Sequence, residues 1–118
     1  MAMTEGITGI NVQDLKEFSA ETRVRKKLIH SQMLSSEVVY YAPGQETVLH
    51  LHPKQDEVFY VVEGSGAITF EDDEIAVTAG SLVFVPAGIR HGVRTDPESQ
   101  LVLLFTKGPG VPPPTVRN

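Results

Sequence analysis

The chain has 118 residues, 41% of them hydrophobic, which is enough for one folded domain with a single core. The formal net charge of -5 provides no basic surface for nucleic acid or for an anionic membrane, so we expect neither as a partner. The chain contains no cysteine, which excludes disulfides, a thiolate nucleophile and cysteine-bound zinc or iron–sulfur sites. Any metal ion must therefore be held by nitrogen and oxygen atoms.

Residues 1–22 are assigned to an N-terminal segment. The start, MAMTEGITG, lacks the basic and apolar regions of a secretion signal, and nowhere do 18 apolar residues follow one another. We therefore expect an intracellular, cytoplasmic protein. Asn11 can cap a short helix from Val12 to Phe18, and Asp14 stands in its first turn, where the helix dipole favours an acid.

Residues 23–106 are typical of short β-strands, because runs of β-branched and aromatic residues alternate with Gly, Pro or acidic turns. About nine strands are predicted: Arg23–His30, Glu37–Tyr41, a strand that carries His50 and His52, Val58–Val62, Ala67–Phe70, Ile75–Thr78, Leu82–Val85, Gly92–Thr95 and Leu101–Phe105. Connections of hairpin length and a single helix predict an all-β antiparallel sandwich or barrel. The Pro-rich residues 107–118 are assigned to a tail.

The stretch from Gly44 to Gly64 carries the strongest chemical signal. His50 and His52 are two residues apart, so on a strand both imidazoles point to the same face. Pro53 and the polar residues after it predict a hairpin turn, and a carboxylate at the start of the returning strand can reach the two rings. Two nitrogens and an oxygen suit a divalent first-row metal. Asp56 and Glu57 are both candidates for the oxygen ligand.

Alternation does not decide between those two acids. Val58–Val62 and Leu82–Val85 are apolar on both faces, so we expect each strand to be covered on both sides, by a second sheet or by another subunit.

The residues from Gly80 to Thr95 form a second constellation, and the two segments together resemble the two motifs of the cupin family. The first motif, a glycine, five residues, His-x-His, three or four residues, Glu, six residues and Gly, is matched at Gly44, His50, His52, Glu57 and Gly64. The second, a glycine, five residues, Pro-x-Gly, two residues, His, three residues and Asn, is matched at Gly80, Pro86, Gly88 and His91, with Thr95 in place of Asn. The spacer of fifteen residues between Gly64 and Gly80 is that of small microbial cupins.

The resemblance implies a double-stranded β-helix, or jelly roll, with a metal ion inside the barrel and one short helix before it. It implies that His50, His52, Glu57 and His91 are the ligands, which decides the choice of acid in favour of Glu57. One divalent ion of iron, manganese, nickel, zinc, cobalt or copper is expected, with coordination positions left open for other ligands.

Cupins with this ligand set include dioxygenases, decarboxylases and sugar isomerases, so the resemblance implies a small metalloenzyme that acts on a small oxygen-rich organic substrate. No residue is assigned as a general base, although Glu57 and Tyr60 are candidates. The alternatives are a non-catalytic module that binds or senses a small ligand, and an interaction element. Dimers are common among cupins, and we expect a homodimer.

The remaining polar and aromatic residues are first interpreted as structural. His30 is read as a hydrogen-bonded structural residue, with a role at the pocket as the alternative. Four cations are read as solvated, with binding of a substrate carboxylate as the alternative: Arg25, Lys54, Arg90 and Arg94. Four aromatic residues are read as core, with the pocket wall as the alternative: Tyr40, Tyr41, Phe59 and Phe84. Gly44, Gly64, Gly80 and Gly88 are read as backbone devices.

Overall fold

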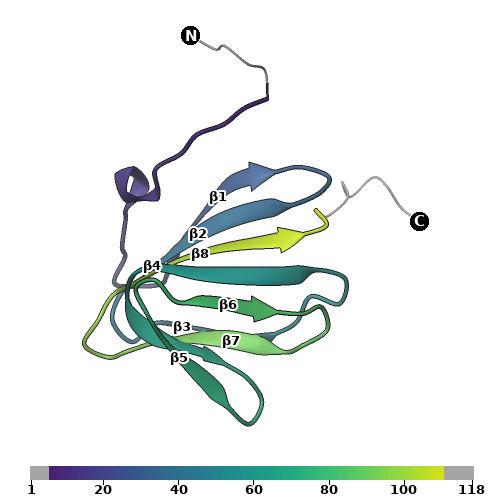
Figure 1. The fold of residues 1–118 in the computed structure, drawn as a ribbon. Coiled ribbons are helices and arrows are strands. Elements are labelled where there is room, and N and C mark those ends of the chain that lie inside the picture. The colour runs from purple at the N-terminus through teal and green to yellow at the C-terminus, as the bar shows by residue number, and fades with distance from the viewer. Residues whose placement is uncertain (1–5, 111–118) are drawn as a thin grey trace.

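The computed structural model describes residues 6–110, whose regular structure is almost entirely β-strand (Figure 1). In chain order the eight strands of this part are β1 (Val24–His30), β2 (Ser35–Tyr41), β3 (Glu46–His50), β4 (Asp56–Thr69), β5 (Glu74–Thr78), β6 (Leu82–Val85), β7 (His91–Thr95) and β8 (Leu101–Gly108). All pairings are antiparallel, which confirms the predicted all-β class. No helix in the described part is long and apolar enough to cross a membrane.

The long strand β4 belongs to two sheets that face each other. Its first half pairs with β8 on one side and β6 on the other, and its second half pairs with β7 and β5. One sheet therefore has the order β1-β2-β8-β4-β6, and these strands lie side by side in Figure 1. The other has the order β3-β7-β4-β5. The candidate ligands are thus brought to one site from both sheets.

The turn predicted at residues 63–66 is wrong, because Val58–Val62 and Ala67–Phe70 are joined in the single strand β4. The pairing with β8 shifts register between Val61 and Glu63, as at a β-bulge, and Gly64 has a φ of +92°. A Cβ at Gly64 would lie 1.7 Å from the carbonyl oxygen of Gln100. Glycine here lets the strand bend from one sheet into the other while its backbone stays paired.

The hairpin predicted around Pro53 is also wrong. β3 pairs with β7 and not with β4, so residues 51–55 cross from one sheet to the other. Both edges of the first half of β4 are already occupied, by β8 and β6, which leaves no edge for β3. His52 follows the end of β3 and lies in this crossing connection.

The predicted helix Val12–Phe18 is shorter in the structure, where a 3-10 helix, η1, covers Val12–Leu15. The side chain of Asn11 accepts a hydrogen bond from the backbone N–H of Gln13 at 2.9 Å, so the predicted cap is present. Leu15 and Phe18 then pack on the outer face of the sheet against the buried Tyr40. The apolar residues of this segment are thus placed by packing on strands, since a helix of two turns has little stability of its own.

Burial alternates along β4: Glu57 and Phe59 are buried between the sheets, whereas Val58 and Tyr60 are 37% and 42% exposed. β6 follows the same pattern, and its Phe84 is 59% exposed, so the prediction that Phe84 belongs to the core is wrong. The outward faces of β4 and β6 are therefore not covered by any part of residues 6–110. The interior between the sheets holds the main core, with Val39, Tyr41, Phe59, Val61, Ile68 and Leu103 among its members.

Candidate metal centre

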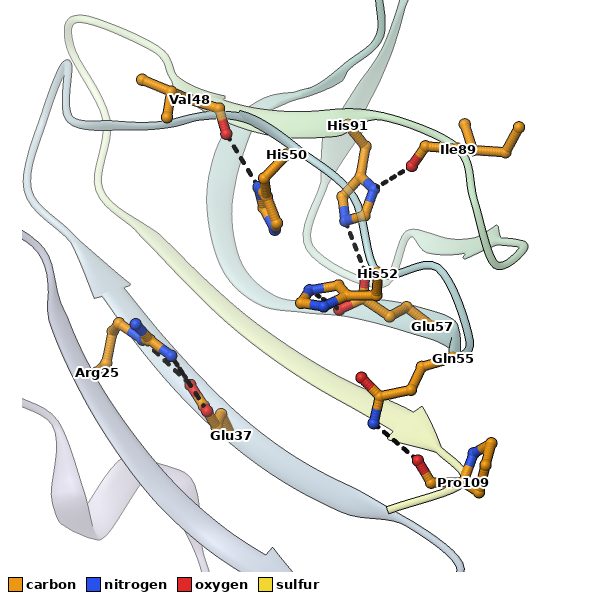
Figure 2. A network of polar contacts seen from close by, with 10 residues as sticks. All are labelled: Arg25, Glu37, Val48, His50, His52, Gln55, Glu57, Ile89, His91 and Pro109. Atoms are coloured by element: carbon orange, nitrogen blue, oxygen red, sulfur yellow. Dashed lines mark hydrogen bonds and ion pairs between the residues drawn. The ribbon is translucent and has the colours of Figure 1, made fainter. Parts of the chain in front are cut away.

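Three histidines and one carboxylate converge at one end of the barrel (Figure 2). His50 is the last residue of β3 and His91 the first of β7, and the two are register partners. His52 follows in the connection to β4, and Glu57 is the second residue of that strand. One ring nitrogen from each histidine lies within 4.8 Å of the others, a spacing at which the three can share an ion.

The backbone between the two sequence motifs holds this cluster in place. The N–H of Gly88 donates to the carbonyl oxygen of His52 at 3.0 Å, and the N–H of Ala87 donates to Oδ1 of Asp56 at 2.9 Å. Gly88 has a φ of +86°, which its turn requires. Asp56 thus points outward and anchors the turn, while its neighbour Glu57 points inward. Tertiary structure thereby separates the two acids that strand alternation in the sequence left equivalent.

Two of the rings are oriented by hydrogen bonds to the backbone. Nδ1 of His50 lies 3.0 Å from the carbonyl oxygen of Val48, and Nδ1 of His91 lies 2.8 Å from that of Ile89. A carbonyl oxygen can only accept, so Nδ1 carries the hydrogen in both rings. Nε2 then presents its lone pair to the centre of the cluster. This is the arrangement in which a backbone partner fixes the tautomer of a metal-ligating histidine.

Glu57 and His91 face each other through two atoms that both accept when the imidazole ring is neutral. Oε1 of Glu57 lies 2.6 Å from Nε2 of His91, both side chains are 2% exposed, and neither atom has a hydrogen-bond partner among residues 6–110. When Nδ1 of His91 holds the ring's one hydrogen, both facing atoms are acceptors. A positive charge between them, a proton or a metal ion, would satisfy both. The donor set therefore fits a cation.

The pKa values of Glu57 and His91 show the same preference for positive charge. Burial lowers the pKa of His91, but the Glu57 carboxylate and the Ile89 carbonyl outweigh it and raise that pKa above its usual value. Burial raises the pKa of Glu57, yet His91 and His52 hold it below its usual value. Burial lowers the pKa of His52 despite the neighbouring Glu57, so this ring is neutral near pH 7 and has a lone pair to offer.

A cavity of about 270 Å³ opens beside the histidines. Its walls combine the metal-ligand candidates with apolar side chains and three cations: Arg23, Arg25, Val39, Tyr41, Thr47, Val48, His50, His52, Glu57, Phe59, His91, Val93, Phe105 and Lys107. The volume lies just below the range of about 300–1,000 Å³ that is usual for drug-sized ligands. The cavity therefore suits a small molecule.

The cations on the wall are mostly not those predicted. Arg25 lines the cavity as the alternative interpretation allowed, but Lys54, Arg90 and Arg94 do not. Arg90 pairs with a carboxylate on the surface, and so does Arg94, in agreement with the solvated interpretation.

Sequence reasoning missed Arg23 and Lys107. β8 continues to Gly108, beyond the predicted end at Phe105, and this extension makes Lys107 the register partner of Glu57. Arg23 lies two residues before Arg25, and residues two apart on an extended chain share a face, so this spacing could have identified Arg23.

The aromatic residues divide between the cavity and the surface. Tyr41 and Phe59 line the cavity, and the hydroxyl of Tyr41 lies 2.8 Å from Oγ1 of Thr47. Burial raises the pKa of Tyr41 above its usual value. Tyr60 points outward, away from the cavity, which removes it as a candidate base. His30 is exposed, and within residues 6–110 its side chain neither forms a hydrogen bond nor lines the cavity.

A family model described as a cupin domain matches residues 37–107, which include all four candidate ligands. The chain belongs to the cupin family. A cupin jelly roll accounts for the curled antiparallel sheets, and the departure at Thr95 leaves the four ligand candidates unchanged. The predicted family and fold are confirmed.

Known proteins resemble this cupin over different lengths. A solved structure from Thermus thermophilus superposes with a TM-score of 0.81 at 26% identity and covers 87% of this chain and 98% of its own. The tetracenomycin polyketide synthase protein TcmJ of Streptomyces glaucescens is 29% identical over 62% of this chain and 49% of its own length. An acireductone dioxygenase of Sulfurihydrogenibium is 49% identical over 38% of this chain and 27% of its own length. The chain thus spans about half, or less, of these curated relatives.

Proposed function

We propose that this cupin binds one divalent transition-metal ion through His50, His52, Glu57 and His91. The observation that carries the proposal is the convergence of three ring nitrogens within 4.8 Å, beside two buried acceptors that face each other at 2.6 Å. Iron, manganese, nickel, cobalt, zinc and copper all suit this set of nitrogen and oxygen donors. When bound with open positions, such an ion supplies a Lewis acid and, for the redox-active members, electron exchange.

We further propose that the site makes the protein a small metalloenzyme of the dioxygenase, decarboxylase or isomerase type. The half-buried His50 and His52 line the cavity, so a ligand in it can reach the centre of the cluster. Tyr41 and Phe59 form an apolar wall that limits access of water. The local similarity to a protein named acireductone dioxygenase supports an oxygen-rich substrate and a dioxygenase among these types.

A non-catalytic module that binds or senses a small ligand is the second candidate. The cavity lining favours this candidate, because it offers no obvious catalytic base. Outside the proposed ligand set, its titratable residues are Arg23, Arg25, Tyr41 and Lys107. None of them is a base near pH 7, since three are cations and burial raises the pKa of the tyrosine. A reaction that needs proton abstraction would then depend on Glu57.

Metal analysis tests the proposed site. The protein is purified without a metal-affinity tag, and its metal content is measured before and after dialysis against each ion. We expect one ion per chain in the wild type and in His30→Ala, the control for an exposed histidine outside the cavity. We expect loss of that ion in His52→Ala and His91→Ala, because each loses one of the four proposed ligands. Full occupancy in both variants would refute the site.

Oxygen uptake and product analysis with a panel of diketones, hydroxy acids and sugar acids then separate the two candidates. Turnover that disappears in His91→Ala supports the enzyme. Stoichiometric metal, together with binding but no turnover of any compound, supports the binding module.

We also propose a homodimer. Four large apolar side chains remain exposed on the outer face of β4 and β6: Val58, Tyr60, Leu82 and Phe84. They are adjacent in the sheet, since Val58 is the register partner of Phe84 and Tyr60 that of Leu82. An uncharged apolar surface is complementary to itself, as a two-fold interface requires. The cytoplasmic location is retained as a proposal on the sequence argument.

A further inference from the structure

The cavity beside the histidines carries more positive charge than its neighbours neutralise. Among residues 6–110, its wall contains three cations, Arg23, Arg25 and Lys107, and one acid, Glu57. This excess stands out in a chain with 15 acidic and 10 basic residues. The wall charge is therefore opposite in sign to that of the protein as a whole.

Within the described part of the chain, only one of the three cations forms an ion pair. Arg25 forms a bidentate contact with the buried Glu37, with Nη2 at 3.0 Å from Oε1 and 3.2 Å from Oε2 (Figure 2). Arg23 and Lys107 form no ion pair with any residue in the described range 6–110. Both are partly buried, so solvent screens their charges less than it would on an open surface.

The two unpaired cations border the apolar part of the cavity. Nζ of Lys107 lies 5.6 Å from the centre of the Phe105 ring, which packs against Phe59. Phe59 in turn packs edge-on against the His91 ring, with 5.5 Å between ring centres. Arg23 is close enough to Tyr41, on the same wall, for its charge to oppose the rise of that tyrosine's pKa. Aromatic surface thus connects the unpaired cations with the histidine cluster.

We propose that the cavity selects a small carboxylate that carries a second oxygen donor, such as a short dicarboxylate, hydroxy acid or oxo acid. Lys107, the register partner of Glu57, binds the carboxylate, and the second oxygen points toward the histidine cluster. Arg23 lies at the other end of the cavity wall, where it adds positive charge without touching the same carboxylate. The cavity of about 270 Å³ limits the ligand to a small one. The part of the proposal that concerns the second oxygen rests on the proposed metal site, whereas the carboxylate contacts do not.

The test compares charged and neutral probes of equal size. Malonate and succinate are titrated against malonamide and succinamide by calorimetry, on metal-free protein and on protein loaded with one zinc ion, at constant ionic strength. The variants are Lys107→Met and Arg23→Gln. Lys54→Met is the matched control, because Lys54 is exposed and does not line the cavity. Zinc content is measured in every sample.

We expect at least one dicarboxylate to bind the wild type about ten-fold more tightly than its diamide, as one or two charged hydrogen bonds allow. We expect Lys107→Met to weaken dicarboxylate binding by about ten-fold, and Arg23→Gln to weaken it by only about two-fold through its more distant charge. Both variants should leave diamide binding and zinc content unchanged. Lys54→Met should match the wild type. Equal affinity for acids and amides, or unchanged acid binding in Lys107→Met, would overturn the inference.

The experiment separates this inference from the proposed function. Zinc that binds stoichiometrically, with no preference for acids over amides, refutes the substrate class and leaves the metal site standing. Acid binding that depends on Lys107 in a protein that binds no zinc supports the carboxylate site and refutes the metal site.

Discussion

Replacement of Glu57 by glutamine should separate metal binding from stability. The side chains of Glu57 and His91 are 2% exposed, and Oε1 and Nε2 lie 2.6 Å apart, so a hydrogen bond joins them only when Nε2 carries a proton. Glutamine keeps the shape but removes the charge, and its amide N–H can donate to Nε2 of a neutral His91. The change therefore removes a proposed ligand and supplies a hydrogen bond in its place.

The effect on metal-free protein should change sign with pH. The folded pKa of Glu57 lies below 4.5 and that of His91 above 6.5. A depressed carboxyl pKa contributes stability above 4.5, which is lost as the pH falls. A raised histidine pKa contributes stability below 6.5, which is lost as the pH rises through the folded value. Both contributions are present together between these two values, where the ion pair is formed.

The expected magnitudes follow from the burial of the pair. At about pH 5.5, within that window, Glu57→Gln should lower the free energy of unfolding by roughly 1–3 kcal/mol, because a charged hydrogen-bonding partner of His91 is lost. At a pH above the folded pKa of His91, where its ring is neutral, the new amide hydrogen bond should cancel the loss or add about 1 kcal/mol. Zinc affinity should fall by at least about ten-fold at the higher pH, since a charged ligand becomes neutral.

Urea denaturation followed by circular dichroism measures the stability, because the chain contains no tryptophan for fluorescence. The protein is first stripped of metal with a chelator, and zinc affinity is measured separately by competition. An equal loss of stability at both pH values would refute the reasoning about the buried pair. Unchanged zinc affinity would show that Glu57 is not a ligand.

Three further predictions concern the bend, the outer face and the turn. Gly64→Ala should prevent folding or lower the free energy of unfolding by well over about 2 kcal/mol, whereas Gly80→Ala should lower it by only about 1–2 kcal/mol. Both glycines have a positive φ, but only at Gly64 does an added Cβ collide with backbone atoms. Urea denaturation distinguishes them, and equal costs would contradict the close approach. Phe84→Glu should convert the proposed dimer into a monomer in sedimentation experiments, while Met33→Glu, also on an exposed side chain, should leave it intact; a dimer in both would place the interface elsewhere. Asp56→Ala should lower the free energy of unfolding by about 1 kcal/mol and weaken zinc binding, whereas Asp56→Asn, which keeps the acceptor oxygen, should keep the stability and the zinc affinity of the wild type. Identical behaviour of the two variants would show that the turn does not depend on this hydrogen bond.

Several errors of prediction share one origin. The segment around Gly64 looks like a turn because glycines and a serine follow one another, yet the backbone there stays paired with β8 and then with β7. The segment around Pro53 looks like a hairpin, but the edges of β4 are taken by β6 and β8. In each case a local pattern described the bend correctly, while strands distant in the sequence decided which backbone groups were paired.

Other features could be predicted because they depend on neighbours along the chain. Short apolar runs between Gly, Pro and acidic turns indicated an all-β fold, and Asn11 caps η1 as expected. The spacing of His50, His52, Glu57 and His91 identified the four residues that the fold brings together. The choice of Glu57 over Asp56 came from the resemblance to a family, since both acids stand directly before Val58–Val62, a run that is apolar at every position.

The amino-acid sequence by itself determined the strand-rich fold, the family and the four residues proposed as metal ligands, because strand propensity and motif spacing are properties of short stretches. Tertiary structure decided the inward direction of Glu57, the facing acceptors of Glu57 and His91, and the two unpaired cations on the cavity wall. Lys107 follows Glu57 by fifty positions and becomes its neighbour only through the register of β8 on β4. Such contacts depend on which strand edges remain open when the sheets assemble, and no local pattern of residues contains that information.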